Sequence, residues 1–141
     1  MAGMIRKNRK GSRRGAALVE MAIVAKLMIL LVLGVIEYSW CLLKCQQLSN
    51  AARVGARAGA RYGSTSTDVT NAVSAAMTAA GMSGSGYTLT STPSNPTTLA
   101  AGALLTIEVS VPYANVDAVG IVLIPTPTTI KGKVVMAREG P

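Results

Sequence analysis

The feature that most constrains the fold of this chain is an apolar run of 28 residues, from Ala16 to Leu43. As an α-helix the run would be about 42 Å long, which is enough to cross the bilayer's hydrocarbon core of about 30 Å. It therefore predicts a transmembrane helix over residues 16–43. The helical pattern continues beyond the run without a proline, so we expect the same helix to extend through residues 44–62 outside the membrane.

One acidic residue inside this run needs an explanation. Glu20 lies just after the start of the run, where inserting a carboxylate into lipid costs about 2.5 kcal/mol or more. An ordinary secretory signal is cut after its apolar core. Here the cleavage site that we expect lies before the apolar core, between Gly15 and Ala16. That cut would create an ammonium group on Ala16, one helical turn from Glu20. A charge that is unfavourable in lipid would then have a partner.

The basic residues are concentrated before Gly15. Six of the fourteen lie there and no acidic residue does, so cleavage would leave eight basic against six acidic residues. The formal net charge of +8 is therefore a property of this short segment, which the positive-inside rule places in the cytoplasm. Because the chain also has few aromatic residues for base stacking, we expect no nucleic-acid partner. The six basic residues are Arg6, Lys7, Arg9, Lys10, Arg13 and Arg14.

Two more charged residues, Lys26 and Glu37, lie in the apolar run. Glu20 is on a different side of the helix from Lys26, and Glu37 is about 16 Å from it along the axis, so neither is a good partner within the chain. Either Lys26 extends its side chain to the cytoplasmic headgroups, or it pairs with a carboxylate on an assembly partner. We treat Lys26 and Glu37 as candidate contacts to other helices.

No set of residues predicts catalysis or metal binding. The chain has no His, and its two cysteines, Cys41 and Cys45, have no further metal-ligating neighbours. We interpret them as small apolar residues near the outer membrane face, with an intermolecular disulfide between packed copies as the alternative. The few acidic residues are scattered, and no nucleophile-base pair or phosphate loop occurs. We therefore expect no enzyme, no cofactor, no metal and no small-molecule substrate.

The helix beyond the predicted membrane segment has a four-residue rhythm. Gly55 and Gly59 belong to a stripe of glycines, and Arg53 and Arg57 belong to a stripe of arginines. Small residues let another backbone approach closely, while stacked arginines need water or carboxylates. Two interpretations remain open and can both hold: these glycines and arginines contact another subunit, or the helix packs on the chain's own domain with the arginines in solvent.

Residues 63–141 predict a small α+β head domain. Apolar residues at helical spacing predict a second, short helix over residues 68–80, with Thr67 or Asp68 as its cap and Gly81 at its end. Alternating apolar and polar residues predict three strands. We expect an antiparallel sheet that buries one face on the helices, and α+β as the fold class of the chain. The predicted strands cover residues 87–91, 105–111 and 129–138.

The start of the chain resembles a type IV prepilin leader, in which a basic segment ends in Gly, Glu is the fifth mature residue and a hydrophobic helix follows. Further segments resemble the TadE-like family, which comprises pseudopilins or minor pilins of the bacterial tight-adherence (Flp) pilus systems. Relatives commonly carry proline at the position of Lys26. The resembling segments are Val19-Glu20-Met21-Ala22, Gly34-Val35-Ile36-Glu37-Tyr38, residues 48–57, residues 106–113 and Met136-Ala137-Arg138-Glu139.

The resemblance implies a structural role in pilus assembly, adhesion or secretion, at the bacterial inner membrane and without catalysis. It implies that a prepilin peptidase cuts after Gly15 and that Glu20 meets the N-terminal amine of a neighbouring subunit. Other pilin subunits and the assembly machinery would be the partners. The first alternative is an uncleaved single-pass protein whose extracytoplasmic domain binds an envelope partner. The second is a cationic membrane-active or nucleic-acid-binding protein, which requires the basic leader to remain.

Overall fold

The computed structural model describes residues 10–120 and 124–140, with side chains described from residue 15 onward. Most of the predicted leader, residues 1–15, lies outside this range. The chain divides into two compact units, Met1–Ile36 and Glu37–Pro141. The predicted membrane segment, residues 16–43, ends inside the second unit, while the predicted head begins only at residue 63.

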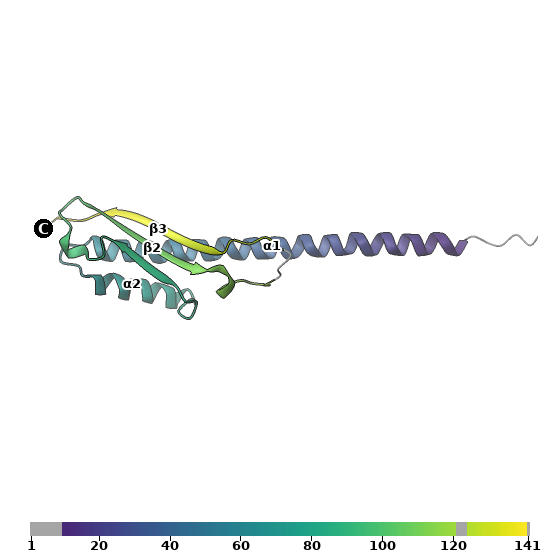
Figure 1. Cartoon of the computed structure of the whole chain (residues 1–141), viewed down its shortest axis with the longest axis horizontal. Coiled ribbons are helices and arrows are strands. Elements are labelled where there is room, and N and C mark those ends of the chain that lie inside the picture. Colours follow the sequence, from purple (N-terminus) through teal and green to yellow (C-terminus); the bar gives the residue numbers. More distant parts are fainter. Residues whose placement is uncertain (1–9, 121–123, 141) are drawn as a thin grey trace, which may run out of the picture. The chain divides into compact units, whose positions relative to one another are not determined.

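One long helix, α1, runs from Lys10 to Ala60 and contributes to both units (Figure 1). It is continuous, as predicted, because the segment has no proline and is rich in Ala, Leu and Met, which favour helices. The helix begins six residues before the predicted start at Ala16 and ends at Ala60, two residues before the predicted end at residue 62. Arg57 lies in its last turn, where a cation is favourable near the negative end of the helix dipole.

In the first unit the described structure is the helix alone. Its most apolar 18-residue window has a mean hydropathy of 2.5, and none of that window is buried in the structure. By length and composition the helix is able to cross a membrane.

The second helix, α2, runs from Ser66 to Ala79. The side chain of Thr65 accepts a hydrogen bond from the backbone N–H of Asp68, and the carboxylate of Asp68 accepts one from the backbone N–H of Thr65. This is a reciprocal capping box, so the predicted cap at Thr67 or Asp68 was wrong by two or three residues. Gly81 follows the helix with a φ of 68°, a conformation that glycine adopts without strain.

Three strands form one antiparallel sheet in the order β1-β2-β3, which confirms the predicted α+β fold class. Each strand boundary lies within one residue of its prediction. Two short 3-10 turns, η1 and η2, follow β1 and β2. The strands are β1 at Thr88–Thr92, β2 at Leu104–Pro112 and β3 at Thr129–Ala137, and the turns are Pro96–Thr98 and Tyr113–Asn115.

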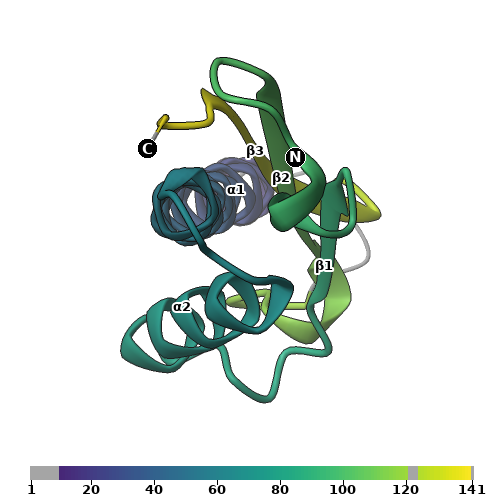
Figure 2. The ribbon, with the colours of Figure 1, turned by 90° about the vertical axis from the view of Figure 1, so that its left-hand side faces the viewer.

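The core of the second unit lies between the sheet and the two helices. Figure 2, which looks along α1, shows α1 and α2 on the same side of the strands. Alternate residues of β2 point into this layer and are fully buried, while the residues between them are half-buried on the other face. The alternation of the sequence thus reflects a sheet with one covered face. The buried residues of β2 are Leu105, Ile107, Val109 and Val111.

At Gly132 the strand β3 packs directly against the backbone of α1. A Cβ atom added to Gly132 would lie 2.4 Å from the backbone carbon of Leu48 and 2.4 Å from the backbone nitrogen of Ser49. Any larger residue would have to separate the helix from the strand, since neither group is a side chain that can rotate away. Glycine is therefore required here for close approach.

We predict that Gly132→Ala lowers the free energy of unfolding by about 1–3 kcal/mol, because the added methyl group overpacks the contact with α1. Thermal unfolding of the full chain in detergent, followed by circular dichroism, measures the effect. Gly84→Ala is the matched control, because a Cβ at Gly84 meets no atom within 4 Å. Equal stability of the two variants would contradict the prediction.

Candidate functional site

The segment of α1 from Ala16 to Ile36 presents an almost entirely exposed apolar surface. Leaving apolar area in water costs about 25 cal/mol for each Å², and large exposed apolar patches are typical of protein or membrane contacts. No other described element of its unit covers this surface. This apolar surface therefore has to be covered by lipid, by apolar helices of other molecules, or by first one and then the other.

Two of the predicted site residues, Glu20 and Lys26, lie exposed on this segment. Neither has an ion-pair partner among the residues that the structure describes. The predicted cleavage site between Gly15 and Ala16 lies within α1, and a side chain at Gly15 would meet no other atom within 4 Å. The structure thus places Glu20 about one turn beyond the predicted cleavage site, with its side chain exposed.

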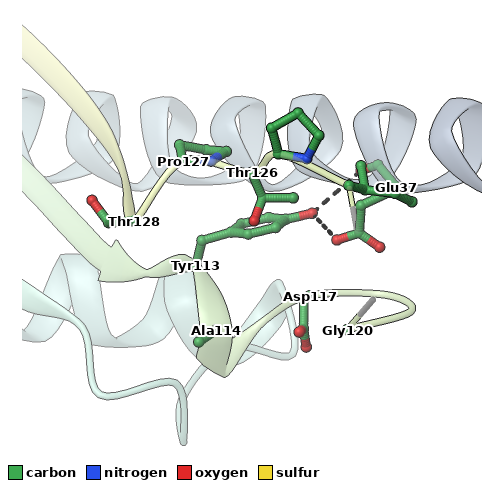
Figure 3. A pocket seen from close by; sticks show the side chains of 10 residues that line it. Glu37, Tyr113, Ala114, Asp117, Gly120, Thr126, Pro127 and Thr128 are labelled. Atoms are coloured by element: carbon green, nitrogen blue, oxygen red, sulfur yellow. Dashed lines mark hydrogen bonds between the residues drawn. The ribbon is translucent and has the colours of Figure 1, made fainter. Parts of the chain in front are cut away.

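Glu37 has a different environment, because it is only 2% exposed. Its carboxylate accepts a hydrogen bond from the hydroxyl of Tyr113 (Figure 3). It accepts a second from the backbone N–H of Val119, at 2.9 Å. The same hydroxyl lies 3.3 Å from the backbone carbonyl oxygen of Glu37. We call these three residues the Glu37 network. Burying a carboxylate is costly unless it is hydrogen-bonded, and here the chain itself supplies the donors.

The local structure around Tyr113 positions its hydroxyl. Pro112 ends β2 and Tyr113 begins η2, so that the ring leaves the sheet and lies against α1. The side chain is 2% exposed. Burial, and then the hydrogen bond to Glu37, raise the pKa of Tyr113 above its ordinary value of 10.0. The phenol therefore keeps its proton and remains a donor to the carboxylate.

Two aromatic residues of α1 hold the same loop by hydrogen bonds. The hydroxyl of Tyr38 donates to the backbone carbonyl of Pro125, and the indole Nε1 of Trp40 donates to the backbone carbonyl of Val116, both at 2.7 Å. The ammonium of Lys44 lies 4.7 Å from the centre of the Trp40 ring, within range of a cation-π interaction. The first two turns of α1 in the second unit are thus tied to the segment that follows β2.

A cleft of about 540 Å³ lies beside the Glu37 network (Figure 3). It contains two carboxylates, but no His, Lys or Cys is among its described lining residues. The carboxylate of Glu37 already accepts hydrogen bonds from two donors of the chain. Its polar lining comprises Glu37, Tyr113, Asp117, Thr126 and Thr128.

Gly55 and Gly59 are in contact with the chain's own domain. A Cβ added to Gly55 would lie 2.4 Å from Cγ2 of Val73 in α2, and one added to Gly59 would lie 2.5 Å from Cδ2 of Leu105 in β2. Packing within the chain, one of the two interpretations of the glycine stripe, is therefore what the structure describes. Arg53 and Arg57 are exposed, and their contact with another subunit stays a prediction.

Cys41 and Cys45 are free and half-buried against the core. Among the described residues no group of three His, Cys, Asp or Glu side chains is placed to hold a metal ion. The intermolecular disulfide proposed for the two cysteines stays untested.

The sequence interpretation missed Tyr113 and Val119 as partners of Glu37. Tyr113 follows a strand whose alternation ends at Pro112, and Val119 lies in an apolar segment without a regular period. Neither position has a signal of its own. The acidic residue in an apolar run was visible, and a search for a donor elsewhere in the chain would have been justified, because a carboxylate in that setting needs one.

Comparison with known proteins supports the resemblance seen in the sequence. Residues 15–57 match the family model described as TadE-like protein. The match begins at Gly15 and includes Glu20, Lys26 and Glu37. The TadE-like family is pilus-associated and is not a known enzyme family. Neither the curated proteins nor the solved structures gave a match.

We predict that Tyr113→Phe lowers the free energy of unfolding by about 1–3 kcal/mol, because the buried carboxylate of Glu37 loses a donor. The pH dependence gives a second readout. The raised pKa of Tyr113 means that the folded chain binds the phenol proton more tightly than the unfolded chain. Its contribution is complete below a pH of about 10 and is lost as the pH rises further, so Tyr113→Phe should lack this alkaline fall.

Urea unfolding of the full chain in detergent between neutral and alkaline pH measures both effects. Tyr62→Phe is the control, since Tyr62 is 67% exposed and its hydroxyl can bond to water. A Tyr113→Phe variant as stable as Tyr62→Phe would show that the Glu37 network contributes nothing to folding.

Proposed function

We propose that this chain, which matches the TadE-like family over residues 15–57, is a structural pseudopilin of a tight-adherence pilus or a related secretion apparatus. In this proposal the chain is cleaved after Gly15 and assembles through its N-terminal helix. The observation on which the proposal depends is the position of Glu20. It lies five residues after Gly15, exposed on an apolar helix and without an ion-pair partner in the described part of the chain.

The energetic argument concerns the carboxylate of Glu20 before and after assembly. In lipid the ionised group costs about 2.5 kcal/mol or more. Cleavage creates an ammonium on Ala16, and in a bundle of parallel helices that group is available to the carboxylate of a neighbour. An ion pair between the two offsets part of the cost only in the associated state. Glu20 would therefore favour association over the isolated membrane-inserted chain.

The apolar surface between Ala16 and Ile36 supports the same role. Lipid covers it while the chain is a membrane protein, and helices of other subunits cover it after assembly. Since lipid is as apolar as the helix, association would depend on close packing and on the pairing of charges. Lys26 is the second charge that could pair in this way, with a carboxylate of another subunit.

The proposed location is the bacterial inner membrane, with a single span. The basic residues before Gly15 would hold the N-terminus in the cytoplasm, so that the α+β domain is outside. The proposed partners are the membrane, the prepilin peptidase, other pilin subunits and the tight-adherence assembly machinery. The alternative is an uncleaved single-pass protein whose outer domain binds an envelope partner.

We predict that the native protein begins at Ala16 in cells that have the peptidase, and that Gly15→Leu blocks this processing. Mass spectrometry of the purified protein identifies the N-terminus. Gly34→Leu is the matched control, because Gly34, like Gly15, lies on α1 with no atom within 4 Å of an added Cβ. An intact leader on the wild-type chain in such cells would favour the uncleaved alternative.

We predict that Glu20→Ala leaves membrane insertion intact or improves it, and reduces incorporation into the assembly. The reason is that the carboxylate is unfavourable in lipid and helps only the associated state. Quantification of the protein in the membrane fraction and in the sheared pilus fraction gives both values. Glu20→Asp, which keeps the charge, should recover part of the incorporation. Equal recovery of Glu20→Ala and wild type in both fractions would exclude a pairing role.

A further inference from the structure

Exposed apolar side chains of the second unit gather where the unit begins. Trp40 is 37% exposed, Leu42 64% and Val119 36%, and Tyr38 and Leu43 are exposed as well. Four of these residues lie in the first two turns that follow Ile36, and Val119 lies in the loop that those turns hold. We call the five residues the apolar collar.

The polar atoms of the collar's aromatic residues are hydrogen-bonded within the chain. Aromatic side chains at a water-facing surface usually direct their polar atom to water. Here the hydroxyl of Tyr38 and the indole N–H of Trp40 donate to backbone carbonyls of the chain. Lys44 lies over the Trp40 ring, so the orientation of the ring is fixed. The polar atom of each ring therefore already has a partner within the chain.

Of the two acidic residues near the collar, Glu37 is removed from the surface, whereas Asp117 of the loop is exposed. The carboxylate of Glu37 is buried, and the backbone N–H that reaches it belongs to Val119, whose side chain is exposed. The same loop therefore covers a charge and presents an apolar side chain. This arrangement suits contact with an apolar or interfacial environment, because an ionised carboxylate near lipid is costly.

The length of the preceding helix places the collar at the edge of a bilayer. From Ala16 to Ile36 the helix has 21 residues, which is about 31 Å and matches a hydrocarbon core of about 30 Å. Residues 37–43 would then follow the core directly. Trp and Tyr are enriched at that level, where one side of the ring is apolar and the surroundings are wet.

We propose that the apolar collar lies in the headgroup layer of the membrane that α1 crosses, so that the second unit rests on the bilayer surface. The binding partner of this surface is the phospholipid interface. The lipid boundary of α1 then falls at Ile36, seven residues before the end of the predicted segment 16–43. The inference rests on the proposed membrane span, and it does not depend on cleavage of the leader.

The experiment uses Trp40, which is the single tryptophan of the chain. The full-length chain is reconstituted in three kinds of phosphatidylcholine vesicle. The first carries bromine atoms on the upper part of the acyl chains, the second carries them near the bilayer centre, and the third carries none. We expect a loss of Trp40 emission that is largest with the upper-chain bromine, and little loss with aqueous iodide. Strong loss with iodide and none with either brominated lipid would overturn the proposal.

A pair of variants tests the loop in the same vesicles. Trp40→Phe combined with Val119→Trp moves the probe to the collar, and Trp40→Phe combined with Val135→Trp moves it to β3, where Val135 is also exposed. We expect brominated lipid to quench the first variant and iodide to quench the second. The same response from both variants would overturn the proposal, and the wild-type measurement stands even if one variant fails to fold.

Two controls distinguish lipid contact at the collar from self-association of the chain and from failure of the span. If Trp40 is shielded from both quenchers until the protein is diluted with excess lipid, a second copy covers the collar and the lipid proposal fails. Flotation of the chain with the vesicles tests the span itself. If the chain floats with the vesicles but brominated lipid does not quench Trp40, this inference alone is contradicted. If the leader remains uncleaved in cells, the proposed function is contradicted and this inference still holds.

Discussion

The constraint on which the rest depends is that one continuous helix has two kinds of surface along its length. Before Ile36 the apolar side chains of α1 have no partner among the described residues of their unit, whereas after Glu37 one face of the helix is buried by α2 and the sheet. The helical hydrogen bonds are satisfied within the segment in both parts, so the backbone tolerates lipid and water alike. What changes is the set of side chains, and this change determines where a membrane can cover the chain.

Glu37 lies at this change of surface, and its surroundings explain why it is compatible with both sides. Glu20 and Glu37 are both acids within the same apolar run, yet only Glu37 has donors in the described part of the chain. The structure thus separates two residues that look alike in the sequence. Folding supplies donors to Glu37, whereas Glu20 is exposed and its pairing with another subunit stays a proposal.

The sequence predicted the helices, the strands and the α+β class well because each depends on a local pattern: a proline-free apolar run, helical spacing and strict alternation. It did not predict the partners of Glu37, which lie 76 and 82 residues away and have no periodic signal. The requirement for glycine at position 132 was also missed, because it arises only where β3 packs against the backbone of α1. The cap of α2 was misplaced although Thr65 and Asp68 have the spacing of a capping box. Cleavage, charge pairing and the domain boundaries remain predictions.

The contact between Gly132 and the Leu48 backbone has a consequence for the order of folding. Synthesis delivers α1 before β3, and a domain folds as a unit once its segments are present. Until the final strand arrives, the face of α1 near Leu48 has no strand to cover it. On the proposed topology, β3 must therefore be translocated before the domain can close. During that interval the nascent chain exposes apolar surface, and a holding factor outside the membrane would protect it from aggregation.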